Sequence, residues 1–390
     1  MVTKISDCLE PSKERTVPSQ SPYHKCVELE HIESNSGRIS GYSETENVIS
    51  LKSVFYKGDI LFGKLRPYLR KYALADFDGL CTTEIWVLRG KCGVDNSYMF
   101  YQLQSDWFIS LANNTTGTKM PRADWNIVKE AEINLPPLPE QRLIAEALSD
   151  TDALLAALEK LIAKKRAIKQ GAMQELLTGK RRLPGFEGEW VEKPLSEIMR
   201  IRKERINPFN YISTRCIELE HIEPISGYLL GWVDSRNQRS LKTLFHSDDV
   251  LFCKLRPYLR KFYFSTFSGV CSTEFWVFTS INDTVANQFI YHLVQMYKFL
   301  EIANSTTGTK MPRADWTLMK DTVFALPSNV AEQTAIASIL SDMDAEIDAL
   351  TAKRNKLRDI KQGMMSELLT GRIRLVGRED TLPLSTRPAT

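Results

Sequence analysis

The sequence predicts an α+β fold with two similar α/β domains separated by two long helices, packed as an antiparallel coiled coil with pseudo-two-fold symmetry. Three observations support this prediction. The sequence consists of two similar copies of one unit. Each copy begins with short apolar runs bounded by glycine and proline, and each ends with a long segment whose apolar residues recur with helical period. At 390 residues the chain is also too long for one ordinary domain.

Long segments return almost unchanged further along the chain. The segment LFGKLRPYLRK at 61–71 returns at 251–261 with one change, and TTGTKMPRADW at 115–125 returns unchanged at 306–316. The offset is 190 residues for the first pair and 191 for the second, so the register hardly drifts. A solenoid would need at least three much shorter repeats. The pattern therefore indicates a tandem duplication of one whole unit.

The opening part of each copy, residues 1–135 and 181–327, is typical of a mixed domain. Runs such as GDILFGK, TTEIWVL and AEINLP are rich in β-branched and aromatic residues and are bounded by breakers, which predicts strands. Apolar residues three and four apart predict a helix at about 97–111 and a counterpart at about 287–303.

The closing part of each copy, residues 136–180 and 328–372, predicts a long helix, and residues 373–390 are expected to form a flexible tail. Ile336, Met343 and Leu350 recur every seven residues, which is the signature of a coiled coil. The corresponding stripe of the first copy is formed by Ile144, Leu148, Leu155, Leu158 and Ile162, with Leu154 and Leu161 widening it.

The charges along both helices favour antiparallel pairing. Acidic residues are concentrated in the first half and basic residues in the second, so the start of one helix attracts the end of the other. Such pairing predicts a rod with one domain at each end. Prolines precede the first helix and Gly179 follows it, whereas the second start, LPSNVAEQ, lacks two of those prolines and is less well defined.

The composition excludes several classes of protein. The longest apolar runs fall well short of a membrane span, and the charged start does not resemble a signal peptide. The seven cysteines contain no C-x-x-C pair, which argues against a disulfide framework and a thiolate zinc site. We expect a reduced, cytoplasmic protein that makes no membrane contact.

The net charge is only +3, from 51 basic and 48 acidic residues, but the basic residues are clustered. Two similar domains related by a pseudo-two-fold axis match the symmetry of a bipartite site in double-stranded DNA. Arginine, lysine and tyrosine serve phosphates and base edges, and a hydroxyl-rich glycine loop suits phosphate. The candidate DNA-binding residues of the first copy are Lys64, Arg66, Tyr68, Arg70, Lys71, Thr115, Thr116, Gly117, Thr118, Lys119 and Arg122.

The same positions in the second copy supply an equivalent set, namely Lys254, Arg256, Tyr258, Arg260, Lys261, Thr306, Thr307, Gly308, Thr309, Lys310 and Arg313. A structural alternative stays open for both sets, in which the cations brace the domain and TTGT is an ordinary turn. Residues that read the base sequence should differ between the copies. The clearest divergence lies between residues 34–50 and 224–240, and both segments are loop-like in composition.

Patterns for catalysis and for metal binding are missing from the sequence. It contains no phosphate-binding P-loop, no G-x-G-x-x-G and no pair of histidines four residues apart. The Glu30-His31 pair recurs as Glu220-His221, but without a nucleophile nearby a structural role is favoured. We expect no catalytic residue and no metal site in this chain.

Taken in order, the LRPYLRK and TTGT-K-PR segments, the LPPLPEQ start of a long helix and the KQG-M-ELLTG end resemble the specificity subunit of type I restriction–modification enzymes. Each occurs in both halves, so the resemblance covers almost the whole chain. It implies that each target recognition domain reads half of a bipartite DNA sequence. It also implies that the paired helices set the spacer and dock two modification subunits.

The resemblance further implies that the chain itself is not catalytic and carries no cofactor. The modification subunits would bind S-adenosylmethionine and methylate adenine, and restriction subunits would add translocation and cleavage that need ATP and Mg. A stand-alone DNA methyltransferase or nuclease is the enzymatic alternative. A coiled-coil scaffold without a DNA role is the alternative from a third class.

Overall fold

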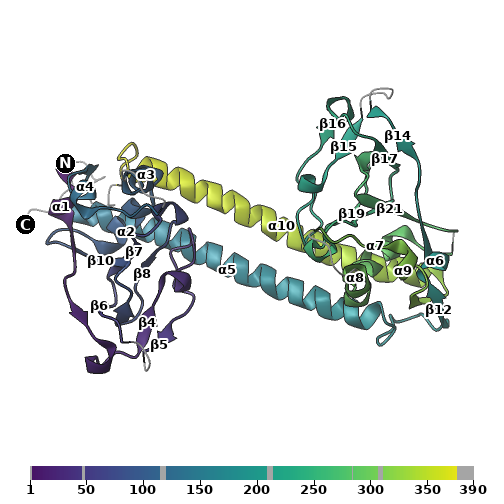
Figure 1. Cartoon of the computed structure of the whole chain (residues 1–390), viewed down its shortest axis with the longest axis horizontal. Coiled ribbons are helices and arrows are strands. Elements are labelled where there is room, and N and C mark those ends of the chain that lie inside the picture. Colours follow the sequence, from purple (N-terminus) through teal and green to yellow (C-terminus); the bar gives the residue numbers. More distant parts are fainter. Residues whose placement is uncertain are drawn as a thin grey trace, which may run out of the picture. The chain divides into compact units, whose positions relative to one another are not determined.

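The computed structural model describes residues 2–45, 49–114, 120–208, 214–282, 284–305 and 311–375. The chain divides into two compact units, residues 1–157 with 354–390 and residues 158–353 (Figure 1). Each unit therefore combines one strand-containing part, called the first or second head, with a stretch of both long helices. The limits predicted at residues 135, 180, 327 and 372 stay predictions. Most of the predicted tail lies outside the described residues.

The first head is built on two sheets and a pair of strands. Four antiparallel strands form one sheet in the order β2 (Leu9–Pro11), β10 (Ile85–Gly90), β7 (Ile60–Gly63) and β8 (Tyr72–Leu74). The five-stranded sheet runs β3 (Arg15–Thr16), β6 (Lys52–Phe55), β9 (Gly79–Cys81), β4 (Lys25–Val27) and β5 (Ser43–Glu44), with β4 and β9 parallel. Strand β1 (Val2–Lys4) pairs with β11 (Glu132–Asn134). The strands predicted from GDILFGK, TTEIWVL and AEINLP are confirmed.

The helices of the first head are short. They are α1 (Ile5–Cys8), α2 (Asn96–Gln104), α3 (Asp106–Ala112) and α4 (Trp125–Val128), with 3₁₀ turns at Pro18–Gln20 and Leu29–His31. The prediction of one helix at 97–111 is wrong, because Ser105 has an extended backbone between α2 and α3. The Ser105 side chain accepts a hydrogen bond from the Phe108 backbone N–H and caps α3, which stabilises the break.

The second head repeats this arrangement. Its four-stranded sheet has the order β13 (Met199–Ile201), β21 (Phe275–Ser280), β18 (Val250–Cys253) and β19 (Phe262–Phe264). Its five-stranded sheet has the order β14 (Arg205–Ile206), β17 (Lys242–Phe245), β20 (Gly269–Ser272), β15 (Arg215–Ile217) and β16 (Val233–Asp234). Strand β12 (Trp190–Pro194) pairs with β22 (Val323–Pro327). Its helices are α6 (Leu195–Ile198), α7 (Asn287–Leu293), α8 (Tyr297–Asn304) and α9 (Trp316–Met319), with 3₁₀ turns at Leu219–His221 and Ser235–Asn237.

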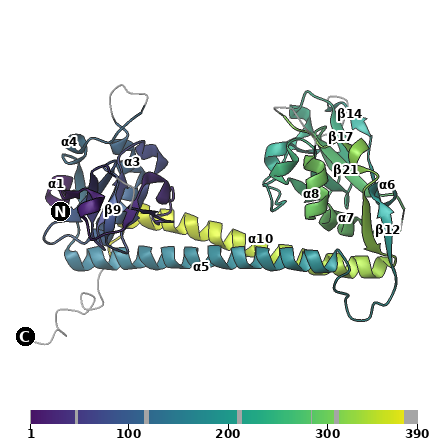
Figure 2. The same cartoon turned by 60° about the horizontal axis from the view of Figure 1, so that its bottom comes forward.

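The helix predicted at 287–303 is also broken. Met296 adopts an extended backbone between α7 and α8, at the position that corresponds to the break in the first head. Figure 2 shows α7 and α8 on the side of the second head that faces the long helices. Their apolar side chains, including Phe289 and Leu293, share one core with residues of those helices.

The two long helices, α5 (Leu138–Leu176) and α10 (Val330–Leu368), contain 39 residues each. The less well defined start of α10 is capped by Asn329, whose side-chain oxygen accepts a hydrogen bond from the Ala331 N–H at 2.9 Å. The predicted stripe of α5 is buried at Ile144, Leu148, Leu155, Leu158 and Ile162. The prediction that Leu154 and Leu161 widen it is wrong, since they are 47% and 38% exposed. Each precedes a stripe residue, and one step along a helix turns the side chain by about 100°.

The two helices run antiparallel within each unit. In the first unit Lys361 of α10 lies 2.7 Å from the Asp152 carboxylate of α5. In the second unit Lys169 of α5 lies 2.6 Å from Asp344 of α10. The acidic start of one helix thus meets the basic end of the other in both units, as the charge pattern predicts.

Each head rests on the start of one long helix and the end of the other. Met365 and Leu368 of α10 lie in the core of the first head, and Met173 and Leu176 of α5 lie in the core of the second. A buried carboxylate at each junction is paired with a more exposed arginine. Arg374 donates two hydrogen bonds to Glu140 at 2.6 and 2.7 Å, and Arg182 does the same to Glu332 at 2.6 and 2.8 Å.

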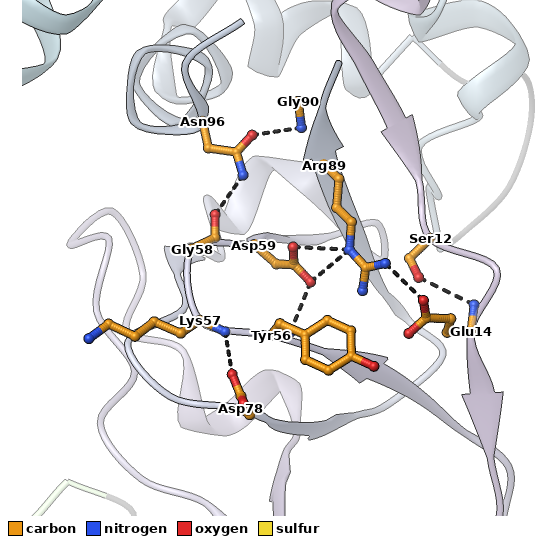
Figure 3. A network of polar contacts seen from close by, with 10 residues as sticks. All are labelled: Ser12, Glu14, Tyr56, Lys57, Gly58, Asp59, Asp78, Arg89, Gly90 and Asn96. Carbon is orange, nitrogen blue, oxygen red and sulfur yellow. Dashed lines mark hydrogen bonds and ion pairs between the residues drawn. The ribbon is translucent and has the colours of Figure 1, made fainter. Parts of the chain in front are cut away.

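A buried carboxylate in each head is paired with an arginine that comes from a different part of the chain in the two copies. In the first head the Arg89 guanidinium donates to Asp59 at 3.1 Å and to Glu14 at 3.0 Å (Figure 3). In the second head Thr279 stands where Arg89 would be, and Arg202 donates to Asp249 at 2.7 Å. Arg202 corresponds to Ser12, which directly follows the neighbouring strand β2. The buried carboxylate therefore requires a guanidinium, whichever segment supplies it.

This exchange predicts a rescue. Arg89→Thr should destabilise the first head by about 3 kcal/mol, because Asp59 is left buried without its cation. Adding Ser12→Arg should recover most of that loss by copying the second head. Hydrogen exchange of peptides from residues 52–90 would measure both effects, with second-head peptides as the internal control. A double variant no more protected than Arg89→Thr would show that the two arrangements are not equivalent.

A buried histidine distinguishes the two units. His292 on α7 is fully buried, with Nε2 3.0 Å from the Ser341 hydroxyl, whereas the corresponding residue of the first head is Tyr101. Burial, helped by the positive charge of Lys169, lowers the pKa of His292 to about 3. In the folded second unit this ring therefore stays neutral between about pH 3 and pH 6.5, whereas in the unfolded chain the same ring is protonated in that pH range.

The second unit should accordingly lose stability in acid. Below pH 6.5 the unfolded chain binds a proton at His292 that the folded state refuses until about pH 3, so lowering the pH favours unfolding. The loss should approach roughly 1.4 kcal/mol for each pH unit in this window. His292→Gln, which replaces the ring with a side chain that does not titrate, should remove this contribution and make the stability of the second unit less dependent on pH between 3 and 8. Denaturant unfolding of both proteins between pH 3 and 8 tests this, and parallel pH profiles would contradict it.

Candidate nucleic-acid interface

The KLRPYLRK segment forms the same strained turn in both heads. In the first, a 3₁₀ turn at Pro67–Leu69 is flanked by Arg66 and Arg70, whose φ angles are 52° and 51°. In the second, Pro257–Leu259 is flanked by Arg256 and Arg260 at 52° and 53°. Left-handed backbone costs a non-glycine residue about 1–2 kcal/mol. The fold therefore holds this turn in a conformation that the residues themselves disfavour.

The turn is held by the segment that follows the hydroxyl-rich loop. The Arg66 N–H donates to the Pro121 carbonyl at 2.8 Å, and the Ala123 N–H donates to the Lys64 carbonyl at 2.8 Å. The second head makes the same bonds, from Arg256 to Pro312 and from Ala314 to Lys254. The structure thus brings the two predicted segments together in each head. Thr115–Lys119 and Thr306–Lys310 themselves lie outside the described residues.

Several of the predicted cations bind within their own head. Arg70 pairs with Asp106, and the Lys71 ammonium donates to the Ile32 carbonyl at 2.7 Å. Arg122 pairs with Glu84 at 3.1 Å. In the second head Lys261 donates to Leu219 at 2.6 Å, and Arg313 pairs with Glu274 at 3.0 Å. These contacts brace the turn, so a DNA contact by the same side chains stays a prediction.

A second group of predicted residues is at least partly exposed. Tyr68 and Tyr258, at the apex of each turn, are 52% and 55% exposed. Within the part of the chain that the structure describes, Lys64, Arg66, Lys254 and Arg256 make no ion pair. Arg260 also lacks an ion-pair partner among the described residues, because Tyr297 stands where the first head has Asp106. The structure therefore divides one sequence motif into bracing cations and available cations.

The divergent segments are attached to these turns. The Asn35 N–H donates to the Arg70 carbonyl at 2.9 Å, and the Ile225 N–H donates to the Arg260 carbonyl at 3.0 Å. Beyond this shared anchor the side chains differ, since the second head exposes Tyr228, Leu230 and Trp232. The first head has Arg38, Ser40 and Tyr42 at those positions. Residues 46–48 of the first segment lie outside the described residues.

One aromatic residue of each divergent segment packs against a cation that lies outside the segment and that also contacts a second ring. In the first head the Lys25 ammonium lies 4.7 Å from the ring centre of Tyr42 and 5.0 Å from that of Phe77. In the second, Arg215 lies 5.3 Å from Trp232 and 4.7 Å from Phe267. Sequence reasoning missed this arrangement, although the matching pattern of one cation and two aromatics in the two copies could have signalled it. Each cation therefore holds the middle of its divergent segment through the Tyr42 or Trp232 ring.

The recurring Glu-His pair is structural. The His31 Nδ1 atom accepts a hydrogen bond from the Glu28 backbone N–H at 3.0 Å, and His221 does the same for Glu218 at 2.9 Å. Both histidines thus close a 3₁₀ turn rather than face an open site. Among the described residues, no cluster of histidine, cysteine, aspartate and glutamate could hold a metal ion. No described helix is long and apolar enough to cross a membrane.

The two groups of cations predict different effects of substitution. Lys71→Met should destabilise the first head by about 1.5–3 kcal/mol, since the Ile32 carbonyl loses a charged donor. Lys64→Met, on the same turn, should change stability by less than about 0.5 kcal/mol. Denaturant unfolding of both variants would measure the difference. Equal losses would mean that Lys64 also braces the turn.

The chain matches the family described as "Type I restriction modification DNA specificity domain" over residues 2–170 and again over residues 187–359. It is 32% identical over 162 residues to the type I restriction enzyme EcoDI specificity subunit of Escherichia coli, which covers 41% of this chain and 35% of that protein. It is 24% identical over 310 residues to the MjaVIII specificity subunit of Methanocaldococcus jannaschii, covering 72% of this chain and 71% of that one. The match thus spans only about a third of the E. coli relative.

Solved structures share the fold. The S subunit of the type I restriction–modification system from M. genitalium aligns with a TM-score of 0.59 and 16% identity, covering 95% of this chain and 96% of that one. A chain from a study titled as the structural basis of assembly and conformational transition of the type I R-M system aligns with a TM-score of 0.54 and 18% identity, covering 96% and 98%. The α+β prediction with two similar domains and long paired helices is confirmed.

Proposed function

Because this chain belongs to the type I restriction modification DNA specificity domain family, we propose that it selects the DNA sequence for a type I restriction–modification complex. Each head binds one half of a bipartite site in double-stranded DNA. The chain catalyses no reaction itself. Its binding to DNA places the other subunits of the complex on the selected sequence.

The observation that carries this proposal is the repetition of one strained turn beside a divergent segment. Arg66 and Arg256 share a left-handed backbone, and both turns expose a tyrosine at the apex. The residues joined to the turns then differ between the heads. Recognition of two different half-sites requires a shared element that binds phosphates, which are alike in every sequence, and a variable element that binds base edges, which differ. The strained turn and the divergent segment fit these two roles.

We assign the phosphate contacts first to the available side chains, which are Lys64, Arg66 and Tyr68 in the first head and Lys254, Arg256, Tyr258 and Arg260 in the second. The remaining predicted residues support them, either as bracing cations or through the hydroxyl-rich loops. Residues 34–50 and 224–240 select the bases of the two half-sites. Recognition domains with limits at 1–135 and 181–327 remain part of this proposal.

The long helices are assigned the spacer and docking roles. Each helix contributes one stretch to each unit, so its length links the two heads through the chain. The partners are two modification subunits, which bind S-adenosylmethionine and methylate adenine, and restriction subunits, which use ATP and Mg. The complex works in the cytoplasm.

Grafting residues 34–50 in place of residues 224–240 should change one half of the recognised sequence and leave the other half as it was. Mapping of methylated adenines in DNA treated with the chain and its modification partner would show this. The matched control exchanges residues 61–71 with 251–261, which differ at one position and should leave the site unchanged. A folded graft that methylates the original site would contradict the role of these segments. Methylation that ignores sequence would contradict the function itself.

A further inference from the structure

The first head contains a cavity of about 540 Å³ that the contacts described so far do not use. It lies where the two sheets of the head meet, beside the residues between β2 and β3 and those between β9 and β10. Lys13, Arg15 and Lys64 line it together with Trp86 and Trp125. Since Lys64 also belongs to the strained turn, the cavity opens next to the proposed DNA surface.

The cations around this cavity are not neutralised by their neighbours. Within the described residues, Lys13, Arg15 and Lys64 form no ion pair, whereas Lys52, Arg70 and Arg89 of the same head all do. Three positive charges that line one cavity repel each other unless an anion lies between them. Their arrangement therefore favours a negatively charged occupant.

The nearby carboxylates face other partners. Side chains alternate along extended backbone, so Glu14 points away from the side shared by Lys13 and Arg15. Figure 3 shows Glu14 bonded to Arg89, at 3.0 Å. Glu84, between the lining residues Thr83 and Ile85, is paired with Arg122 at 3.1 Å. Neither carboxylate therefore neutralises the three cations that line the cavity.

The remaining walls suit a sugar–phosphate chain. Trp86 and Trp125 meet edge to face, with ring centres 5.6 Å apart, and give an apolar wall for sugar carbons. Ser12, Ser53 and Thr83 add hydroxyl groups that can donate to phosphate oxygens. A single inorganic phosphate would leave most of this volume empty, whereas a stretch of backbone would fill more of it.

We propose that this cavity binds the sugar–phosphate backbone of the DNA half-site held by the first head, with Lys13 and Arg15 as phosphate-contacting residues beyond the turn. The inference rests on the proposed function. Lys203, Arg205, Trp276 and Trp316 stand at the corresponding positions of the second head, and both of these cations are exposed there. The DNA contact in each head then extends from the strained turn to the start of the five-stranded sheet.

The test measures binding of a duplex carrying the recognised site to the full chain assembled with its modification partner. For Lys13→Gln/Arg15→Gln we expect the slope of log K against log salt to fall by about 1.8, since each lost phosphate contact contributes about 0.9. The matched control, Lys57→Gln/Lys91→Gln, removes two exposed lysines of the same head outside the cavity. It should change the slope by much less.

A second measurement identifies the phosphates. Single methylphosphonate substitutions along the first half-site should weaken wild-type binding at one or two positions, and the double variant should be insensitive there. Unchanged slope and pattern in the double variant, with a lowered slope in Lys64→Gln/Arg66→Gln, would overturn this inference while the proposed function stands. Wild-type binding without sequence preference or salt dependence would overturn the function as well. The inference about the cavity would also be overturned if the cavity binds free deoxynucleotides while the double variant binds DNA with unchanged affinity.

Discussion

The buried carboxylates near the starts of the long helices hold each unit together. Glu140 and Glu332 each accept two hydrogen bonds from an arginine that follows the end of the other helix. The Arg374 hydrogen bonds hold the pKa of Glu140 below its usual range, so the pair stays charged at neutral pH. A carboxylate in such a place without its arginine would be strongly unfavourable. The helix ends are therefore fixed against the heads, and the heads depend on chain that is distant in sequence.

The duplication lets one sequence serve as its own comparison. Where both heads keep a residue and give it the same contact, as with His31 and His221, the role is structural. Where the contact is kept but its residue moves, as with Arg89 and Arg202, the partner carboxylate is what the fold requires. Where only the side chains differ, as in Tyr228 against Arg38, the backbone contact is the same, since each N–H donates at 3.1 Å to the serine hydroxyl two residues earlier. Under the proposed function, such side chains help to specify the DNA sequence.

Much of the fold could be predicted, because its signals are local. The seven-residue spacing of apolar residues and the change from acidic to basic residues along each helix predicted the long antiparallel helices. Apolar runs bounded by glycine and proline predicted the strands. The break at Ser105 was missed, since a helical apolar pattern continues through it and only the capping bond reveals it. The exposure of Leu154 was missed because the sequence does not tell which side of a wide stripe meets the partner helix.

The candidate site was predictable as a set of residues but not as a division of roles. Lys64 and Lys71 stand seven residues apart in one basic segment, and nothing local separates them. The Ile32 carbonyl, which engages Lys71, comes from a part of the chain 39 residues away. Arg122 likewise finds Glu84 38 residues away. A cation that already pairs with a neighbour is less able to bind a phosphate. Under the proposed function, the affinity of each head for DNA therefore depends on which partners the fold brings near each cation, and the basic motif alone overstates the number of DNA contacts.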